Sequence, residues 1–391
     1  IIFFVINFKI SSLKYLCNQT GIQLIRIHYY EYQNIKTMIQ KTVLHINMFA
    51  ICLFTICSPN TYAQQRNKPV IIGYVGGYNG NIIATEQIEA KRLSLINYAF
   101  VDIKANRAWL HNEKTDTVNF RKLVELKKIN PDLKILISVG GWTWSKNFSD
   151  AVLTDTSTQN FAQSCVDIVA TYQLDGVDID WEYPGLPGDN NKYRPQDRTG
   201  YTALFKALRE KLDVISRTTG KKYLVTTAIG GSREFLQHTQ MEIAQKYLDY
   251  INLMSYDFDG TYDNMSSHHS NLYTPSHMPY IYSADVCIKN LKAVGVNLNK
   301  VVMGIGFYGK GKIVESSEQN GLYQLPVKPR YGGGFTYIKD SLVNKGGYVR
   351  YWDALSKAPY LFNAETKSFI TYDDEESVTL KCNYIKKYKL A

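Results

Sequence analysis

The sequence predicts an α/β fold in which parallel strands, each followed by a helix, close into a barrel. Seven strand-like apolar runs alternate with helical patterns, and strands that alternate with helices pair in parallel. Polar residues cluster where these runs end, which is where parallel barrels place their active sites. A doubly wound nucleotide-binding sheet is the alternative. It is disfavoured because residues 73–77, Gly-Tyr-Val-Gly-Gly, lack the G-x-G-x-x-G register, and the sequence contains no P-loop.

The chain has 391 residues, of which 45% are hydrophobic, enough for one large domain with a substantial core. Helical patterns are expected where apolar residues recur every three or four positions. The expected strands are 70–75, 95–101, 133–139, 174–181, 223–229, 250–254 and 301–307, and the clearest expected helices are 120–128, 161–172, 201–215 and 284–294.

The fourth strand carries an unusual series of acids, Asp-Gly-Val-Asp-Ile-Asp-Trp-Glu at 175–182. Side chains alternate along a strand, so Asp178, Asp180 and Glu182 are expected on one face, about 6 to 7 Å apart. Carboxylates this close cannot all ionise at low cost in a desolvated site, so at least one raised pKa is expected, which suits a general acid. A calcium or magnesium loop is the alternative, but the apolar, β-prone residues between the acids favour a strand.

Three motifs resemble those of glycoside hydrolase family 18. Residues 174–182 are similar to the family's D-x-x-D-x-D-x-E signature, residues 138–141 (Ser-Val-Gly-Gly) to its S-x-G-G strand, and residues 254–257 (Met-Ser-Tyr-Asp) to its M-x-Y-D strand. The motifs follow in the family's order, and the resemblance covers about residues 70–387. It implies a TIM-type (β/α)8 barrel that acts as a chitinase on β-1,4-linked N-acetylglucosamine.

The resemblance also implies a substrate-assisted, retaining mechanism, in which the acetamido oxygen of the substrate attacks the anomeric carbon. Glu182 would act as general acid and then as general base. Asp180 would orient the acetamido group and stabilise the positive intermediate. Asp178 would hold or share a proton with Asp180, and Tyr256 would donate to the acetamido carbonyl.

Further residues are expected to line the substrate cleft or to support the acids. Sugar rings present apolar faces, so a chitin cleft needs aromatic platforms with polar edges. The substrate-binding positions implied by the resemblance are Trp142, Tyr183, Phe100, Met254, Asp257 and Tyr74. The hydroxyls of Tyr74 and Ser138 are expected to satisfy Asp178.

The segment after the seventh strand departs from barrel periodicity. Residues 311–355 contain many glycines and resemble a small α+β insertion found in part of the family, which forms a cleft wall. Lys310 stands where the family commonly has the Arg of Y-G-R, so a bidentate fork is lost there. The helix from about Ser377 is expected to end at Ala391, and the chain is interpreted as truncated before strand eight.

The N-terminal residues predict a targeting segment. Residues 1–37 lack a coherent pattern and are interpreted as lying upstream of the natural start. Residues 38–63 have the pattern of a signal peptide, with Lys41, an apolar run at 46–57 and a small-residue cleavage site ending at Ala63. The run of about 12 residues is shorter than the roughly 20 that span a membrane. A secreted or periplasmic catalytic domain at 64–391, with no stable membrane span, is therefore expected.

Neither a metal nor a cofactor is expected. Beyond the leader, Cys165, Cys287 and Cys382 are too widely spaced for a metal site or a disulfide framework and are expected to be buried thiols, although one pair could bridge. His268 and His269 are expected in a polar loop without a ligand role. The net charge is +10, but the basic residues are not concentrated in one run of the sequence, so nucleic acid is not an expected partner. The expected partner is chitin or chitooligosaccharide, bound by a monomer.

Two other functions fit parts of the pattern. An endo-β-N-acetylglucosaminidase acting on glycoprotein glycans shares the acidic strand but generally lacks the insertion. A carbohydrate-binding lectin on the same barrel typically loses the last acid of the series, whereas Glu182 is present here.

Overall fold

The computed structural model describes residues 69–258, 265–278 and 282–391. The expected upstream segment 1–37 and signal peptide 38–63 lie outside the described residues. The chain divides into two compact units, and the second, Pro69–Ala391, contains every described residue. Everything below concerns this second unit.

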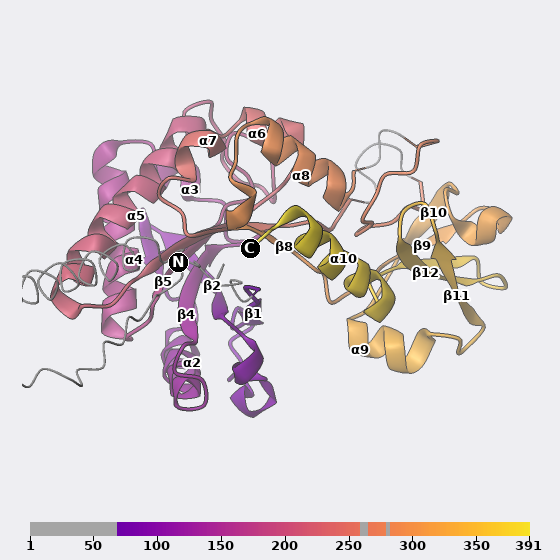
Figure 1. Ribbon diagram of the computed structural model, residues 1–391, viewed down its shortest axis with the longest axis horizontal. Coiled ribbons are helices and arrows are strands. Elements are labelled where there is room, and N and C mark those ends of the chain that lie inside the picture. The colour runs from indigo at the N-terminus through magenta and orange to yellow at the C-terminus, as the bar shows by residue number, and fades with distance from the viewer. Residues whose placement is uncertain (1–68, 259–264, 279–281) are drawn as a thin grey trace, which may run out of the picture. The chain divides into compact units, whose positions relative to one another are not determined.

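A parallel sheet of seven strands forms the centre of the unit (Figure 1), and it confirms the predicted TIM-type barrel class. Its strands are hydrogen-bonded in the order β1, β2, β4, β5, β6, β7, β8, each beside its predecessor. The short strand β3 pairs with β2 in the antiparallel sense. The bounds are β1 (Ile72–Gly76), β2 (Leu95–Lys104), β3 (Arg107–Trp109), β4 (Lys134–Gly140), β5 (Gly176–Asp180), β6 (Leu224–Ile229), β7 (Tyr250–Leu253) and β8 (Val301–Met303).

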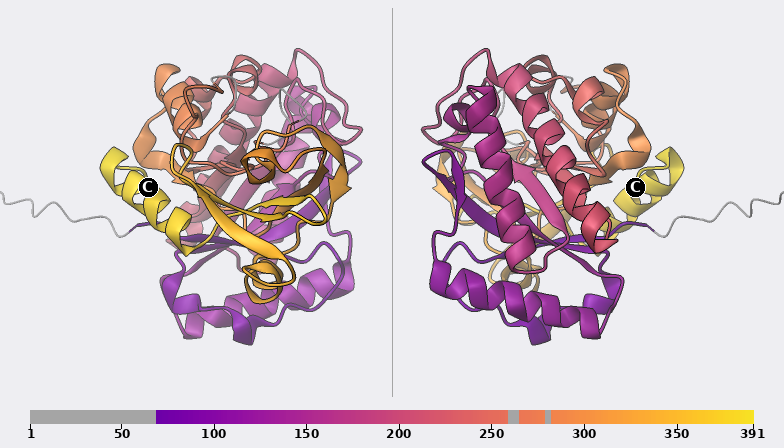
Figure 2. Two further views of the ribbon diagram at one scale, coloured as in Figure 1. Left: turned by 90° about the vertical axis from the view of Figure 1, so that its right-hand side faces the viewer. Right: turned by 90° about the vertical axis from the view of Figure 1, so that its left-hand side faces the viewer.

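Helices follow the strands and pack along the outer side of the sheet (Figure 2). The α-helices are α2 (Glu113–Glu125), α3 (Phe148–Ala151), α4 (Asp155–Thr171), α5 (Asp197–Thr219), α6 (Arg233–Gln237), α7 (Met241–Ala244), α8 (Ala284–Ala293), α9 (Phe335–Tyr337) and α10 (Glu375–Tyr388). Short 3-10 turns lie at Thr85–Gln87, Ala90–Arg92, Leu126–Lys128, Leu298–Lys300 and Glu318–Gly321, and a π turn at Ile338–Leu342. In the described part of the chain, no helix is both long and apolar enough to cross a membrane.

The sequence determines both the ends and the buried face of helix α4. Thr154 is its N-cap residue, and the Thr154 side chain accepts a hydrogen bond from the backbone N–H of Ser157 in a reciprocal capping box. Phe161, Cys165 and Val169 are fully buried at four-residue spacing, so one stripe of the helix faces the core. This is the helix that the pattern at 161–172 predicts.

A five-stranded antiparallel sheet follows β8, in the order β10, β9, β13, β12, β11, and it confirms the predicted insertion. Its strands are β9 (Lys310–Val314), β10 (Pro326–Arg330), β11 (Tyr348–Asp353), β12 (Ala358–Asn363) and β13 (Ser368–Thr371). The sheet extends beyond the expected 311–355, because β13 pairs with both β12 and β9 and so joins the two parts of the sheet. Leu361 and Ile370 pack on one face of it, and Phe362 and Phe369 on the other.

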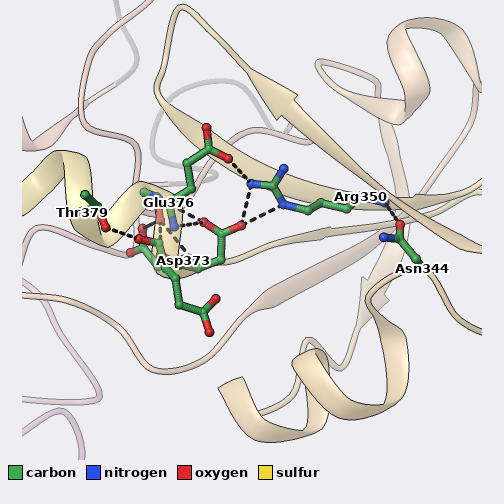
Figure 3. Close-up of polar contacts among 8 residues, drawn as sticks. Asn344, Arg350, Asp373, Glu376 and Thr379 are labelled. Atoms are coloured by element: carbon green, nitrogen blue, oxygen red, sulfur yellow. Dashed lines mark hydrogen bonds and ion pairs between the residues drawn. The ribbon is translucent and has the colours of Figure 1, made fainter.

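Polar contacts join this sheet to the start of α10 (Figure 3). The guanidinium of Arg350 on β11 donates to Asp374 Oδ2 at 2.8 Å and to Glu376 Oε2 at 2.9 Å. One turn further along α10, Lys381 Nζ pairs with Asp373 Oδ2 at 2.5 Å, and both side chains are buried. The acids before α10 therefore cap the helix and bind cations. The backbone N–H of Ala391, after α10, donates to Val301 O of β8 at 3.0 Å.

The three cysteines of the described residues are all free thiols. Cys165 on α4 and Cys287 on α8 are buried, as predicted. The expectation that Cys382 is buried is wrong, because this residue lies on the exposed side of α10.

Candidate active site

The acidic series lies at the carboxyl end of β5, in the middle of the parallel sheet. Val177, Ile179 and Trp181 point into the apolar core, where the Trp181 ring stacks on Phe148 at 5.0 Å. The alternate residues therefore face the other side, towards the barrel interior. The strand ends at Asp180, so Glu182 lies in the following turn and not on the strand itself.

Asp178 is fully buried and accepts four hydrogen bonds. Its Oδ2 accepts from Tyr74 OH at 3.0 Å and Ser138 Oγ at 2.7 Å, the two hydroxyls expected there. Its Oδ1 accepts from Thr226 Oγ1 at 2.5 Å and Asn252 Nδ2 at 3.2 Å. Burial raises the pKa of Asp178, and these four donors oppose the rise by stabilising the carboxylate.

Sequence reasoning missed Thr226 and Asn252. Thr226 lies opposite Asp178 in the register of β5 and β6, and Asn252 sits within the apolar run that forms β7. Both are polar residues inside runs that are buried on both faces. Because a buried polar side chain needs a hydrogen-bond partner, this pattern could have indicated that they contact the acids.

Asp180 and Glu182 carry the most strongly perturbed carboxyl groups of the site. Burial raises the pKa of Asp180 well above its ordinary value, and the charges of Glu182 and Asp178 raise it further. Among the described residues, Asp180 Oδ1 has no hydrogen-bond partner. Burial also raises the pKa of Glu182 to about 7, with a contribution from Asp257, while a hydrogen bond from Tyr183 opposes the rise. A carboxyl group with this pKa can both donate and accept a proton near neutrality.

Two contacts from the β4 side fix the turn that carries Glu182. The backbone N–H of Glu182 donates to Ser145 Oγ at 2.9 Å, and Ser145 Oγ donates to Gly141 O at 2.8 Å. Gly140 has a φ of +109°, and a Cβ there would lie 2.1 Å from Asp180 O. Only glycine permits this approach of β4 to β5, which is the physical reason for the S-x-G-G pattern. Ser145 is a third residue that sequence reasoning missed.

Tyr256 follows β7 and faces the same carboxyl groups. Burial raises the pKa of its hydroxyl, and the negative charges of Asp180 and Glu182 raise it further. The hydroxyl therefore stays protonated at neutral pH and is available as a hydrogen-bond donor.

Asp257 is the neighbour of Tyr256 and has a left-handed backbone, with φ of +62°. Its Oδ1 accepts from Tyr308 OH at 2.9 Å and pairs with Lys310 Nζ at 2.9 Å. Burial alone would raise the pKa of Asp257, but polar contacts from His269 and Lys310 lower it to about 2. Asp257 is therefore a fixed negative charge beside the acid series, and the Lys that replaces the family's usual Arg holds it.

Four of the expected cleft residues lie on or just after strands β2, β4, β5 and β7. Trp142 is 52% exposed, and its ring meets Tyr183 edge-on at 6.4 Å between centroids. Phe100 packs against Gly141, where an added Cβ would lie 2.7 Å from the Phe100 ring. Met254 is half-buried and directly follows β7. These exposed and half-buried apolar groups suit the faces of a sugar ring.

The described residues were also compared with the side-chain groups that bind metal ions. Within the described ranges, no group of three or more His, Cys, Asp or Glu side chains could hold a metal ion. The site contains one carboxyl group with a pKa of about 7, Glu182, together with two buried carboxyl groups and a tyrosine hydroxyl that can donate. These groups are the ones that a hydrolase uses in acid–base catalysis.

The comparisons with known proteins agree with this class. Residues 70–391 match the family described as Glycosyl hydrolases family 18, and the chain belongs to that family. It is 36% identical over 389 residues to chitinase A1 of Niallia circulans, covering 83% of this chain but 55% of that protein. It is 30% identical over 367 residues to chitinase B of Serratia marcescens, covering 77% of this chain and 72% of that one. The chain thus spans little more than half the length of chitinase A1.

Solved structures of the family share the fold. A family 18 N-acetylglucosaminidase from Paenibacillus barengoltzii is 37% identical with a TM-score of 0.76, over 83% of this chain and 93% of that one. Chitinase ChiA74 from Bacillus thuringiensis is 32% identical with a TM-score of 0.75, over 82% of this chain and 64% of that one.

Proposed function

We propose that the protein hydrolyses the β-1,4 bonds between N-acetylglucosamine residues of chitin or chitooligosaccharides. The observation that carries this proposal is the series Asp178, Asp180 and Glu182, which ends in an acid with a pKa of about 7. The chitinases among its relatives support the substrate class.

In the proposed mechanism, Glu182 protonates the glycosidic oxygen while the acetamido oxygen of the substrate attacks the anomeric carbon. The bond to the leaving sugar breaks and a cyclic oxazolinium ion forms. The carboxylate of Glu182 then accepts a proton from the water that opens this ring, which restores the acid. Configuration at the anomeric carbon is retained, because two displacements occur in succession.

Three further residues orient the acetamido group and stabilise the charge that develops in this step: Asp180, Asp178 and Tyr256. Asp180 accepts the acetamido N–H and stabilises the developing positive charge through its own negative charge. Asp180 Oδ1 has no partner among the described residues, which leaves it available to the substrate. Asp178 shares a proton with Asp180, since two buried carboxyl groups this close do not both ionise readily. Tyr256 OH, held protonated, donates to the acetamido carbonyl.

The remaining positions are proposed to bind the sugar chain. The rings of Trp142, Tyr183 and Phe100 form apolar platforms, and Met254 lines the cleft beneath the reacting sugar. Asp257 accepts hydrogen bonds from sugar hydroxyls through the oxygen that Lys310 does not bind. Tyr74 lines the cleft floor, while its hydroxyl and that of Ser138 hold Asp178.

The test is the Glu182→Gln variant, assayed for hydrolysis of chitotetraose by chromatography of the products. Glutamine keeps the shape but has no acidic proton, so the turnover number should fall by a factor of about 10² to 10⁴. Glu86→Gln, an exposed glutamate in a 3-10 turn, is the matched control and should retain full activity. Turnover of Glu182→Gln equal to that of the control would exclude Glu182 as the acid.

A second candidate is an N-acetylglucosaminidase that releases single sugars. One observation favours it: the chain covers 93% of the length of the family 18 N-acetylglucosaminidase, against 55% of chitinase A1. The same chromatogram separates the two. Early release of N-acetylglucosamine and chitotriose in equal amounts supports this candidate, whereas early release of the dimer supports a chitinase.

We further propose that residues 38–63 are a signal peptide and that 64–391 is the secreted catalytic domain. The support is the apolar run at 46–57 before the small-residue site at Ala63. N-terminal sequencing of protein recovered from the medium or periplasm should begin at Gln64, and an intact leader on that protein would contradict the proposal.

A further inference from the structure

The interior of the parallel sheet changes from apolar to polar between two successive layers of side chains. The lower layer is a small apolar cluster that includes Ile72, Leu95, Leu136, Leu224 and Tyr250. Side chains alternate along a strand, so the residue two positions later on each strand lies on the same face, one layer further up. These later residues all carry hydrogen-bonding side chains: Tyr74, Asn97, Ser138, Thr226 and Asn252. Asp178 on β5 belongs to this upper, polar layer, because four of the five donate to it.

Asn252 makes the contact that spans the polar layer. Its Nδ2 donates to Tyr74 OH at 2.9 Å and to Asp178 Oδ1 at 3.2 Å. Tyr74 lies on β1 and Asn252 on β7, with four strands of the sheet between them, so the curvature of the sheet brings the two side chains together. The Tyr74 hydroxyl in turn donates to Asp178 Oδ2 at 3.0 Å. Asn252 therefore acts on the Asp178 carboxyl group by two routes, one direct and one through Tyr74.

The same contacts determine which way the Asn252 amide points. An ionised carboxyl group only accepts hydrogen bonds, so the NH2 group of Asn252 must face Asp178. The reverse orientation would place the amide oxygen against a carboxylate oxygen. In the described part of the chain, Asn252 Oδ1 has no hydrogen-bond partner, so no contact there favours the reverse orientation. The single hydrogen of the Tyr74 hydroxyl is then directed to Asp178, because its oxygen already accepts from Asn252.

Asn252 differs from the other donors to Asp178 because it cannot reverse. Tyr74, Ser138 and Thr226 donate through hydroxyls, which can rotate and accept instead, whereas an amide NH2 group only donates. The two oxygens of a carboxylate offer about four lone-pair sites, and four donors occupy them here. A proton on Asp178 must therefore displace a donor, and the Asn252 N–H always requires an acceptor at Oδ1.

We propose that Asn252 is a positioning residue of the hydrolysis: it stabilises negative charge on Asp178 and fixes the Tyr74 hydroxyl there, so that the pair of Asp178 and Asp180 carries one proton and not two. This role rests on the function proposed above and includes no contact between Asn252 and the substrate. One proton is what the mechanism needs, because Asp180 stabilises the positive intermediate only while it is ionised.

The titratable groups that act on Asp178 come from four elements. They are the hydroxyls of Tyr74 on β1, Tyr201 on α5 and Tyr256 after β7, and the carboxyl group of Asp180 on β5. Loss of solvent raises the pKa of each tyrosine, and the carboxyl charges raise it further, so all three stay neutral below pH 10. Asp180 is the member of this group whose charge changes. It lies two residues from Asp178 on the same face of β5, and carboxyl groups so close titrate as a pair.

The expected direction follows from the lost donor. Without the Asn252 amide, the Asp178 carboxylate keeps three hydrogen bonds instead of four and binds a proton more readily. The pair then takes up its second proton at a higher pH, and Asp180 is neutral in that state. The acid limb of the pH profile of kcat/KM should therefore move upward. The alkaline limb should stay in place, because near neutrality the pair carries one proton with or without the amide.

The experiment measures kcat and KM for chitotetraose against pH in the full chain, after circular dichroism has shown each variant to be folded. Asn252→Leu keeps nearly the same shape but has no donor. We expect kcat to fall by roughly 10- to 100-fold, as for the loss of a hydrogen bond to a charged group, with KM within about threefold and the acid limb about one pH unit higher. Asn290→Leu is the matched control, because Asn290 is a buried asparagine on α8 whose Nδ2 donates to Gly231 O at 3.1 Å. Its acid limb should not move.

A second comparison shows whether Asn252 acts through Asp178. In the Asp178→Asn background, no carboxylate remains at this position for the amide to stabilise. Adding Asn252→Leu there should leave the acid limb in place and change kcat by less than about threefold.

If Asn252→Leu does not fold, Asn252→Ala replaces it with the same expected results. An acid limb that does not move in the donor-free variant overturns the inference. An equally large loss of kcat in the Asp178→Asn background also overturns it, because the role of Asn252 would then be structural only. Either result in an active wild type leaves the proposed function standing. A wild type that releases no product contradicts the proposed function and the inference together.

Discussion

Glu182, the proposed acid, is a residue at which the needs of function and of stability oppose each other. Its pKa is raised to about 7, mainly by burial, whereas an unfolded glutamate titrates near its ordinary value of 4.5. Between those two values the folded state binds more protons than the unfolded state, so the free energy of unfolding falls as pH rises through this window. The destabilisation by the buried Glu182 carboxylate therefore reaches its full size above about pH 7.

This predicts that Glu182→Gln, which cannot ionise, is more stable than the wild type at pH 8. The difference in the free energy of unfolding should be about 1 to 3 kcal/mol and should shrink towards zero as pH falls to about 4.5. Urea unfolding at several pH values measures it, with Glu86→Gln as the exposed control. A variant that is less stable at pH 8, or a difference that does not depend on pH, would refute a raised pKa at Glu182.

The residue scale is also where sequence and structure differ most. The shared face of Asp178 and Asp180 could be predicted from their spacing, because side chains alternate along a strand, whereas Glu182 lies just beyond the strand end. Thr226 and Asn252 left only a general signal, a polar residue inside a buried run, and Ser145 left none, because the sequence does not state how neighbouring segments align. The burial of His269 could not be predicted either, because it depends on the packing of the insertion against the barrel.

At the scale of elements, periodicity was a good guide. The strands β1, β2, β4 and β6 lie within a few residues of the expected runs, because continuous apolar runs are what a sheet buried on both faces requires. The run expected at 301–307 was too long. The strand β8 ends at Met303, and Phe307 after it is 71% exposed. Apolar character alone cannot separate a strand from the aromatic loop that follows it.

The insertion shows a different limit. Its glycines and broken periodicity at 311–355 indicated a separate element, but strands β12 and β13 lie beyond the expected bounds. They belong to the antiparallel sheet because Ser368–Thr371 pairs with β12 on one side and with β9, more than fifty residues earlier, on the other. Long-range pairing of this kind leaves no local pattern in the sequence.

At the scale of the whole described unit, the fold brings together groups that the chain keeps far apart. Tyr74 and Asn252 meet on Asp178 across 104 and 74 residues of sequence. Lys310, at the start of the insertion sheet, reaches Asp257 beyond β7. The barrel thus supplies the acids, and the insertion supplies Lys310, which pairs with Asp257 beside them. Both parts are therefore needed for the proposed site.

The central claim is that the substrate's own acetamido group is the nucleophile and that Glu182 serves as acid and base. The most direct measurement is proton NMR of the new reducing end in the first minutes of chitotetraose hydrolysis, before mutarotation. Two successive displacements predict the β-anomer as the initial product. Initial release of the α-anomer would mean direct attack by water, and it would contradict the mechanism proposed for Asp180, Tyr256 and Glu182.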